Sequence, residues 1–145
     1  MVVSHETLAG LIPHRGAMCL LHEVLHMDDE SITCRAISHR DPDHPLREEG
    51  ILPALSGIEY AAQAMAVHGA LRESRGPQSG VLAAVRDVVL NVERLDDIPD
   101  DLVLTARRLL NDHTRLLYEF EVRAGSRELL RGRAVVVLGV NGAMA

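Results

Sequence analysis

The order of apolar and polar positions along the chain predicts one long helix among several strands. Residues 54–72, "ALSGIEYAAQAMAVHGALR", contain no proline and place apolar side chains around most of a helical circumference. This pattern is typical of a helix that is buried on nearly every side. Pro53 suits its first turn, and "SRGPQSG" ends it with glycine and proline. A shorter helix near the start of the chain is expected to stop before Pro13.

The other apolar segments predict strands that are separated by turns. Alternation is clearest where Tyr118, Phe120 and Val122 would share one face of a strand. Turn sequences such as "LDDIPDD", "NDHT" and "AGSR" separate the later segments. Two strands are expected before the long helix and four after it, at residues 19–29, 31–39, 81–92, 102–112, 115–124 and 128–140.

This order of elements predicts an α+β protein with a single domain, residues 1–145. A helix that is apolar on nearly all sides must be covered on nearly all sides. Five to six antiparallel strands can curl around it. One long buried helix wrapped by one curved antiparallel sheet is the hotdog fold. A generic α+β domain, with the same elements packed differently, is the alternative.

Composition and charge exclude several classes of function. Lysine is absent, the net charge is −6 and 2% of the residues are aromatic, so a nucleic-acid surface is not expected. Cys19 and Cys34 lack a metal-ligand spacing and predict buried thiols in a reducing compartment, without a metal or a cofactor. The chain has neither a signal-peptide pattern nor an apolar run that could span a bilayer, which predicts a cytoplasmic protein.

Two motifs in the first half of the chain resemble a known enzyme family. The first, "LIPHRGAMCLLHEV", contains Pro13, His14 and Arg15; the second, "HPLREEGILPALSGIEYAAQAMAVHGAL", contains His44 and Glu59. Together they resemble the 3-hydroxyacyl-carrier-protein dehydratases of the FabZ and FabA type. The stretch "GIEYAAQAMAVHGAL" is most similar to the ApeP-like dehydratases of aryl-polyene synthesis. Beyond these motifs the agreement is in strand pattern alone.

The resemblance implies dehydration of 3-hydroxyacyl thioesters to trans-2-enoyl thioesters, in fatty-acid-like or aryl-polyene synthesis. In that family a loop histidine removes the proton α to the thioester. An acid on the helix, contributed by the other subunit of a dimer, protonates the departing hydroxyl. These roles fall on His44 and Glu59. Histidine titrates near neutrality, and burial would raise the pKa of a helix carboxyl so that it keeps a proton.

Five further residues are expected to line this site. The N–H groups of Ala54 and Leu55, at the positive end of the helix dipole, would receive the enolate oxygen. His14 and Arg15 belong to the first motif. Gln63 lies one turn after the acid on the same helix face, where it could orient the acid or make a polar contact in a dimer interface.

Three features depart from the family's pattern. Pro45 stands where the family has phenylalanine, and Ala54 stands where it has glycine. His44 precedes the helix acid by 15 positions, one more than in typical members. The extra residue makes His39 the alternative base. His68, nine positions after the acid, faces roughly the opposite way and is expected to be a core or interface histidine.

The implied substrate would arrive on an acyl carrier protein, which is acidic and needs a positive patch to bind. Arg72 and Arg75, or Arg107 and Arg108, could supply that patch. Two alternatives come from other classes of protein. One is a hotdog thioesterase in which Glu59 activates water, and the other is a non-catalytic subunit that stabilises an active hotdog partner. A homodimer or heterodimer is expected in every case.

Overall fold

A computed structural model describes residues 6–7, 18–73, 80–112 and 114–138 of the chain. It contains the one long helix and six strands that the sequence predicts. The short helix expected before Pro13 lies outside the described residues, apart from Glu6 and Thr7. In chain order the elements are β1 (Glu23–Met27), β2 (Ser31–Ala36), η2 (Ser38–Arg40), η3 (Ala54–Ser56), α2 (Gly57–Glu73), β3 (Gly80–Leu90), β4 (Leu102–Asn111), β5 (Arg115–Ala124) and β6 (Arg127–Leu138), where η marks a 3₁₀ helix.

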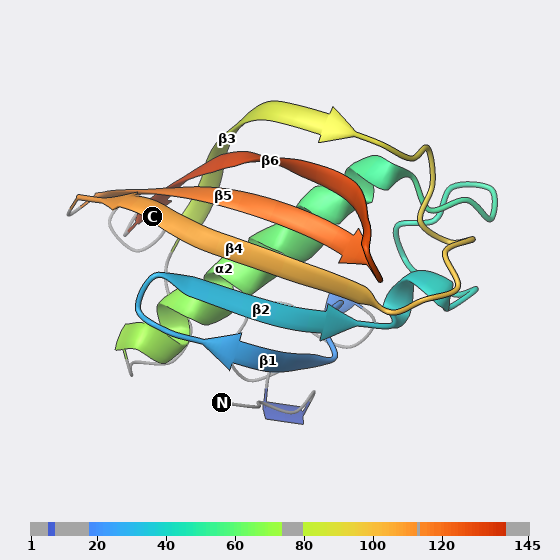
Figure 1. Ribbon diagram of the computed structural model, residues 1–145, viewed down its shortest axis with the longest axis horizontal. Helices are drawn as coiled ribbons and strands as arrows, with labels where there is room; N and C mark the ends of the chain where they lie inside the picture. The colour runs from blue at the N-terminus through green and yellow to red at the C-terminus, as the bar shows by residue number, and fades with distance from the viewer. Residues whose placement is uncertain (1–5, 8–17, 74–79, 113, 139–145) are drawn as a thin grey trace.

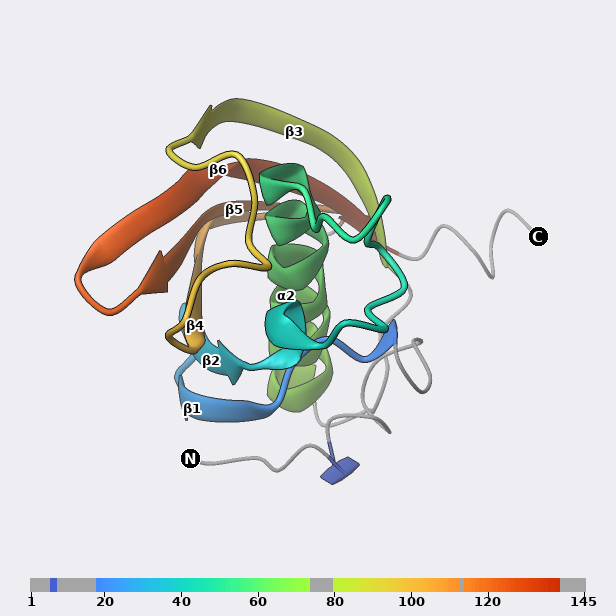
Figure 2. The same cartoon turned by 90° about the vertical axis from the view of Figure 1, so that its right-hand side faces the viewer.

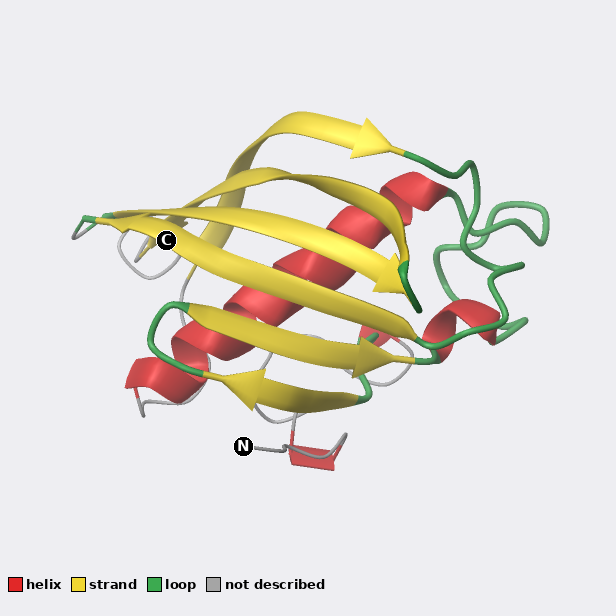
Figure 3. Ribbon diagram, viewed as in Figure 1, coloured by secondary structure: helices red, strands yellow, loops and turns green. Residues whose placement is uncertain are grey.

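The six strands form one antiparallel sheet in the order β1-β2-β4-β5-β6-β3. Figure 1 shows α2 lying along one face of this sheet. In Figure 2 the sheet is seen to curve around the helix. Figure 3 shows that loops gather at the end of the molecule where α2 begins. The predicted α+β hotdog architecture is confirmed.

The burial of α2 follows from its composition. From Gly57 to Leu71 every residue of the helix is buried or half-buried. Tyr60, Gln63 and His68 are fully buried even though they carry polar groups. The half-buried positions 59, 62, 66 and 69 recur at helical spacing and therefore form one face. That face is the least covered side of the helix in this protomer.

The inner face of the sheet supplies the apolar residues that cover the helix. In β5 the buried residues alternate with half-exposed or exposed ones. Tyr118, Phe120 and Val122 are all buried, as the alternation of this segment predicts. Gly132 on β6 leaves room for the Phe120 ring, because a Cβ at Gly132 would lie 2.8 Å from Phe120 Cζ. Close approach between the strands therefore depends on this glycine.

The first strand is shorter than the sequence suggests, because it begins at Glu23 rather than at Cys19. Gln63 on α2 binds the backbone of the preceding segment. Its Oε1 accepts the N–H of Leu20 at 2.9 Å, and its Nε2 donates to the carbonyl of Met18 at 2.6 Å. Backbone groups that bond to a helix side chain cannot pair with a strand at the same time. The segment before β1 is thus part of the helix packing.

Strand β3 lies at an edge of the sheet and pairs with β6. Two irregularities interrupt this pairing, one between Leu82 and Ala84 and one between Arg86 and Val89. Within the second, Asp87 has a φ of +54°, in the left-handed region that favours glycine. On its other side, β3 pairs with none of the described strands. An edge of this kind is where a second sheet can add.

Candidate active site

His44 lies in the loop that leads into α2, and both of its ring nitrogens are engaged. The side chain is buried, with 4% of its surface exposed. The N–H of Leu46 donates to Nδ1 at 3.1 Å, and Nε2 lies 3.0 Å from the hydroxyl of Tyr60. Tyr60 is on α2 and has no exposed surface. One hydrogen bond therefore ties the candidate catalytic loop to the buried side of the helix.

The direction of this hydrogen bond follows from the other contacts of the ring. A neutral imidazole has one N–H, and the nitrogen that accepts from Leu46 cannot carry it. The proton of His44 therefore sits on Nε2 and is donated to Tyr60. Tyr60 in turn donates to Oγ of Ser38 at 2.7 Å, and Ser38 donates to the carbonyl of Leu20 at 2.8 Å. The three bonds run one way, from His44 to a backbone acceptor.

The surroundings keep both ends of the His44–Tyr60 bond neutral. Burial lowers the pKa of His44, and the charge of Arg47 lowers it further, while Asp41 opposes the shift. Burial also raises the pKa of Tyr60 to about 12. In this state neither nitrogen of His44 has a free lone pair. Action as a base requires Nδ1 to give up the N–H of Leu46.

Glu59 lies in the first turn of α2 but on another side of the helix. Successive helical residues are turned by about 100° around the axis, so Glu59 and Tyr60 point in different directions. Tyr60 points into the core towards His44, whereas Glu59 is half-buried on the least covered face. The full burial expected for this carboxyl is therefore not reached within one protomer. Within one protomer, the candidate base and the candidate acid therefore lie on different sides of α2.

The start of the helix also differs from expectation at the two candidate oxyanion donors. The N–H of Ala54 donates to the carbonyl of Glu93 at 3.0 Å, so it is already used in this protomer. The first bonds of η3 are donated by Ser56 and Gly57. Leu55 precedes them, and its N–H belongs to the helix start that has no intrahelical acceptor. Leu55 therefore stays the oxyanion candidate, and Ala54 fixes the loop.

Of the other residues predicted to line the site, the structure describes Gln63. His14 and Arg15 lie outside the described residues. Gln63 is fully buried, and its amide bonds the backbone of Met18 and Leu20 instead of serving as an orienting partner for the acid. Its structural role is to anchor the segment before β1. A role for it in lining the site stays a prediction.

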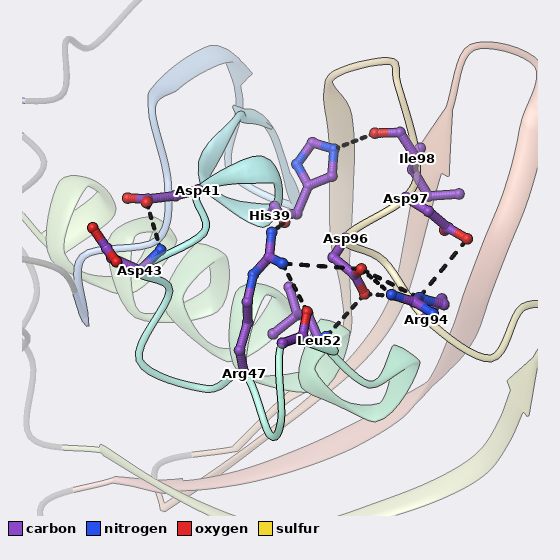
Figure 4. A network of polar contacts seen from close by, with 10 residues as sticks. His39, Asp41, Asp43, Arg47, Leu52, Arg94, Asp96, Asp97 and Ile98 are labelled. Atoms are coloured by element: carbon purple, nitrogen blue, oxygen red, sulfur yellow. Dashed lines mark hydrogen bonds and ion pairs between the residues drawn. The ribbon is translucent and has the colours of Figure 1, made fainter.

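A network of charged side chains fixes the loop that carries His44, as Figure 4 shows. Asp96 is at its centre, with 7% of its side chain exposed. It accepts the N–H of Leu52 at 2.9 Å, forms an ion pair with Arg94 and lies 4.0 Å from Arg47. The hydrogen bond from Arg94 is the main reason that the pKa of Asp96 falls to about 2. The segment between β3 and β4 thus holds the loop before α2.

His39, the alternative base, belongs to the same network (Figure 4). Its ring has no exposed surface. Nε2 lies 3.1 Å from the carbonyl of Ile98 and 3.0 Å from that of Asp100, so this nitrogen carries the proton. Nδ1 is buried without a hydrogen-bond partner in the described part of the chain. A ring without exposed surface cannot reach a substrate in this conformation, and its contacts instead clamp the loop.

His68 is a core histidine, as its position on the helix predicts. It is fully buried. Its Nε2 lies 2.9 Å from the carbonyl of Asp28, and its Nδ1 lies 2.6 Å from the hydroxyl of Tyr118. When the ring is neutral, Nε2 donates to the carbonyl and Tyr118 donates to Nδ1. In this pair the tyrosine donates to the histidine, whereas in the other pair His44 donates to Tyr60.

The arginines expected to receive a carrier protein are partly engaged within the protomer. Arg107 lies 3.9 Å from Glu119, and Arg108 donates to the carbonyl of Asp29 at 3.2 Å. The side chain of Arg72 and all of Arg75 lie outside the described part of the structure.

The described residues also bear on metal, redox and membrane sites. Across the ranges that the structure describes, three or more His, Cys, Asp or Glu side chains nowhere gather as a possible metal site. Cys19 and Cys34 are free, buried thiols, and burial raises the pKa of Cys34 to about 12. Over the same ranges, no helix has the length and apolarity needed to cross a membrane.

The roles of Tyr60, Ser38 and Asp96 are not evident from the sequence. Tyr60 reads as an apolar residue of a buried helix, and Ser38 as the end of a strand. Asp96 is one of four aspartates in a turn sequence, where any one of them could be a solvated turn residue. A buried tyrosine needs a hydrogen-bond partner, which is the one signal that could have pointed to Tyr60.

A model of a known protein family matches most of the chain. The model of the ApeP-like family, described as ApeP dehydratase, matches residues 6–141. The chain belongs to this family. The match extends over nearly the whole chain, beyond the two motifs that carry the resemblance in sequence. No curated protein sequence gives a significant match.

Solved structures agree with the fold. The dehydratase heterocomplex ApeI:P from Xenorhabdus doucetiae has a TM-score of 0.82 and 24% identity, covering 94% of this chain and 93% of that chain. Zebra fish thioesterase superfamily member 2 has a TM-score of 0.65 and 14% identity, covering 93% of each chain. A mutant thioesterase from Pseudomonas aeruginosa has a TM-score of 0.60 and 15% identity, covering 81% and 80%. The dehydratase interpretation therefore agrees with the family, and the thioesterases are more distant in structure.

Proposed function

We propose that this protein is a subunit of a dimeric dehydratase that acts on 3-hydroxyacyl thioesters carried by an acyl carrier protein. The family match over residues 6–141 is the observation that carries the proposal. The site that supports it is the buried His44 beside the start of α2, with Glu59 in the first turn of that helix.

The proposed reaction uses His44 as the base and Glu59 as the acid. His44 takes the proton α to the thioester carbonyl, and the C–H electron pair passes to the enolate, whose oxygen is received by the N–H of Leu55. The electrons then form the C=C bond while the C–O bond at the β carbon breaks. Glu59 protonates the departing hydroxyl, which leaves as water. Transfer of the proton from His44 back to Glu59 restores both groups.

The proposed active unit contains two protomers. Within one protomer, His44 contacts the Tyr60 side of α2, whereas Glu59 lies on the half-exposed face. A pair of helices related by dimerisation would bring the Glu59 of one subunit to the His44 of the other. The free edge of β3 offers a surface for that dimer, since it can extend the sheet into a second subunit. The partner is a second copy or another hotdog subunit, as in the ApeI:P heterocomplex.

The carrier protein is proposed to bind the outer face of the sheet. Residues 40–50 and 93–101, at the loop end, contain nine acidic side chains and three arginines, a net charge of −6 that would repel an acidic carrier. On the outer face, Arg86 of β3 and Arg133 of β6 are directly opposed. Neither forms an ion pair with a described residue, and together they line a cavity of about 330 Å³. Arg133 also borders a neighbouring cavity of about 730 Å³.

A second candidate function is that of a subunit that depends on an active partner. The engagement of both His44 nitrogens favours it, because a base without a free lone pair cannot accept a proton. In that case this chain would contribute Glu59 and stability, and the partner would contribute the base. The thioesterase alternative has no comparable support from a contact in the site.

The test is dehydration of a 3-hydroxyacyl carrier-protein substrate by the purified protein, followed by mass spectrometry. Wild type should lose one water from the acyl chain, and His44→Ala and Glu59→Gln should each abolish that loss. His26→Ala and Glu48→Gln, at exposed positions outside the proposed site, should act like wild type. Inactivity of the wild type alone, with activity restored by a hotdog partner, would select the second candidate. Release of a free acid would instead indicate a thioesterase.

A further inference from the structure

We propose that Tyr60 and Ser38 are positioning residues that hold the Nε2–H of His44 and so raise the basicity of Nδ1, the atom that acts as the base. The use of Nδ1 in a reaction rests on the proposed function. The effect of the two residues on its basicity rests on the contacts alone, so the two can be tested separately.

Each partner in the hydrogen-bond chain that begins at Leu46 and ends at Leu20 has a fixed role as donor or acceptor. The N–H of Leu46 can only donate, which makes Nδ1 an acceptor. The carbonyl of Leu20 can only accept, which makes Ser38 the donor to it. Ser38 must then accept from Tyr60, and Tyr60 must accept from Nε2 of His44. Both ends of this hydrogen-bond chain are backbone groups, so side-chain rotation cannot reverse the direction of its bonds.

The acceptor at the end of this hydrogen-bond chain is itself held in place. Leu20 supplies the final carbonyl, and its N–H is bound by the buried amide of Gln63 at 2.9 Å. The other end of that amide holds the carbonyl of Met18 at 2.6 Å. Tyr60 and Gln63 are on the same buried helix, with no exposed surface. The acceptor that orders the hydroxyls is therefore fixed to the element that carries Tyr60.

The two hydroxyl groups also affect the charge that His44 can carry. Both hydroxyl groups point their protons away from His44, so the oxygen of Tyr60 faces the Nε2–H with its lone pairs. When Nδ1 takes up a proton, the imidazolium keeps this acceptor, and the aligned O–H dipoles stabilise the positive charge. Removing the Tyr60 hydroxyl should therefore weaken the basicity of Nδ1. Nε2 would keep its proton, because the N–H of Leu46 still occupies Nδ1, but that proton would lose its acceptor.

The charged groups around His44 do not replace this effect. On the loop side, Arg47 and His39 disfavour the imidazolium, and Asp41 favours it. On the helix side, the group in contact is the neutral phenol of Tyr60. Asp96, from the segment before β4, is already paired with Arg94 and Arg47. Tyr60 is thus the group whose loss should change the proton affinity of His44 without changing the net charge.

The protein contains a matched control. Tyr118 and His68 form a second buried tyrosine–histidine pair, at 2.6 Å. There the histidine Nε2 donates to a carbonyl and the tyrosine donates to Nδ1. Tyr118→Phe removes a buried hydroxyl of the same kind but outside the His44 chain. It should reproduce any general loss of stability and leave His44 unchanged.

The experiment is ¹⁵N NMR of the histidine rings as a function of pH, in wild type, Tyr60→Phe, Ser38→Ala and Tyr118→Phe. In wild type the ring of His44 should carry its proton on Nε2. In Tyr60→Phe the proton should stay on Nε2, because the N–H of Leu46 still occupies Nδ1, and the midpoint of His44 titration should fall by about one pH unit, roughly a tenfold change in proton affinity. Ser38→Ala should lower the midpoint by less, and it keeps the phenol in place if Tyr60→Phe does not fold.

Several results would overturn the inference. One is a wild-type His44 with its proton on Nδ1. Another is a Tyr60→Phe protein with the titration midpoint of wild type, or a Tyr118→Phe protein with the same change at His44. Where dehydration is measurable, Tyr60→Phe should lower kcat about tenfold, move the acid limb of the pH–rate profile to lower pH and leave KM unchanged. The expected titration shift in a protein without dehydratase activity would keep the positioning role and reject the proposed function.

Discussion

The Nε2 atom of His44 donates a hydrogen bond to the hydroxyl of Tyr60 at 3.0 Å, and this bond joins the loop before α2 to the buried side of the helix. Tyr60 is the neighbour of Glu59 in sequence, yet the two side chains point to different sides of α2. The same helical turn thus fixes the candidate base within the protomer and places the candidate acid on the half-buried face, where the proposed partner would lie. This arrangement relates the proposed dimer directly to the proposed chemistry.

Gln63 should matter for stability through the backbone that it binds. Replacing it with leucine removes both amide contacts and leaves the N–H of Leu20 and the carbonyl of Met18 without their partners. A buried group left unpaired costs about 1–3 kcal/mol, so we expect a loss of at least about 2 kcal/mol in the free energy of unfolding. Urea denaturation measures it. Asn91→Ala, which removes an exposed amide, should change the free energy by less than about 0.5 kcal/mol, and an equal loss in both variants would contradict this role.

Asp96 should contribute a pH-dependent part of the stability. Its pKa is lowered to about 2 in the folded protein, below about 3.9 for an unfolded aspartate. Its contribution is therefore complete above about pH 4 and is lost as the pH falls towards 2. We expect Asp96→Asn to be less stable than wild type at pH 7, with a difference that shrinks as the pH falls from 4. Urea denaturation across this range measures it.

The control for Asp96 is its neighbour. Asp97 is 60% exposed and lies 3.8 Å from Arg94, so Asp97→Asn should show little of this pH dependence. A stability difference for Asp96→Asn that stays constant from pH 7 to pH 3 would show that the charge of Asp96 is not what holds the loop.

Gly57 sets how closely the start of α2 approaches the sheet. A Cβ at this position would lie 2.6 Å from Cδ2 of Leu130, a fully buried residue of β6. Gly57→Ala should therefore destabilise the protein by about 1–3 kcal/mol through overpacking. Thermal unfolding of Gly57→Ala, Leu130→Val and the double variant measures the coupling. The double variant should lose less stability than the sum of the two single changes, and strict additivity would rule out the steric cause.

The proposed carrier site predicts a change in binding rather than in chemistry. Arg133→Glu and Arg86→Glu should each raise KM for the carrier-linked substrate several-fold and weaken its dependence on salt, with kcat retained. Arg127→Glu, an exposed arginine at the start of β6, is the matched control and should leave KM near that of wild type. Steady-state rates measured at two ionic strengths give KM, kcat and their salt dependence for each variant. Equal effects of all three variants would indicate a general effect of net charge instead of a binding site.

The fold was predictable because it depends on patterns that extend over many residues. The long helix without a polar face and the alternation around Phe120 require a sheet that curves around the helix. The site was less predictable because it depends on single contacts. Nothing in the sequence shows that the N–H of Ala54 is taken by Glu93, or that the amide of Gln63 is used by Leu20. Pairs that are so distant along the chain become visible only when the packing is known.

The position of β3 also has a consequence for folding. This strand is made before β4 and β5, but its partner is β6, which is the last strand of the chain. A newly synthesised β3 therefore stays unpaired until β6 has been made. Non-local pairing of this kind is slow. The two irregularities and the left-handed Asp87 divide its edge into short stretches, which limits extended pairing with a β3 segment from another unfinished chain but leaves those stretches for the proposed dimer. The irregularity of β3 can thus protect the chain from aggregation during synthesis.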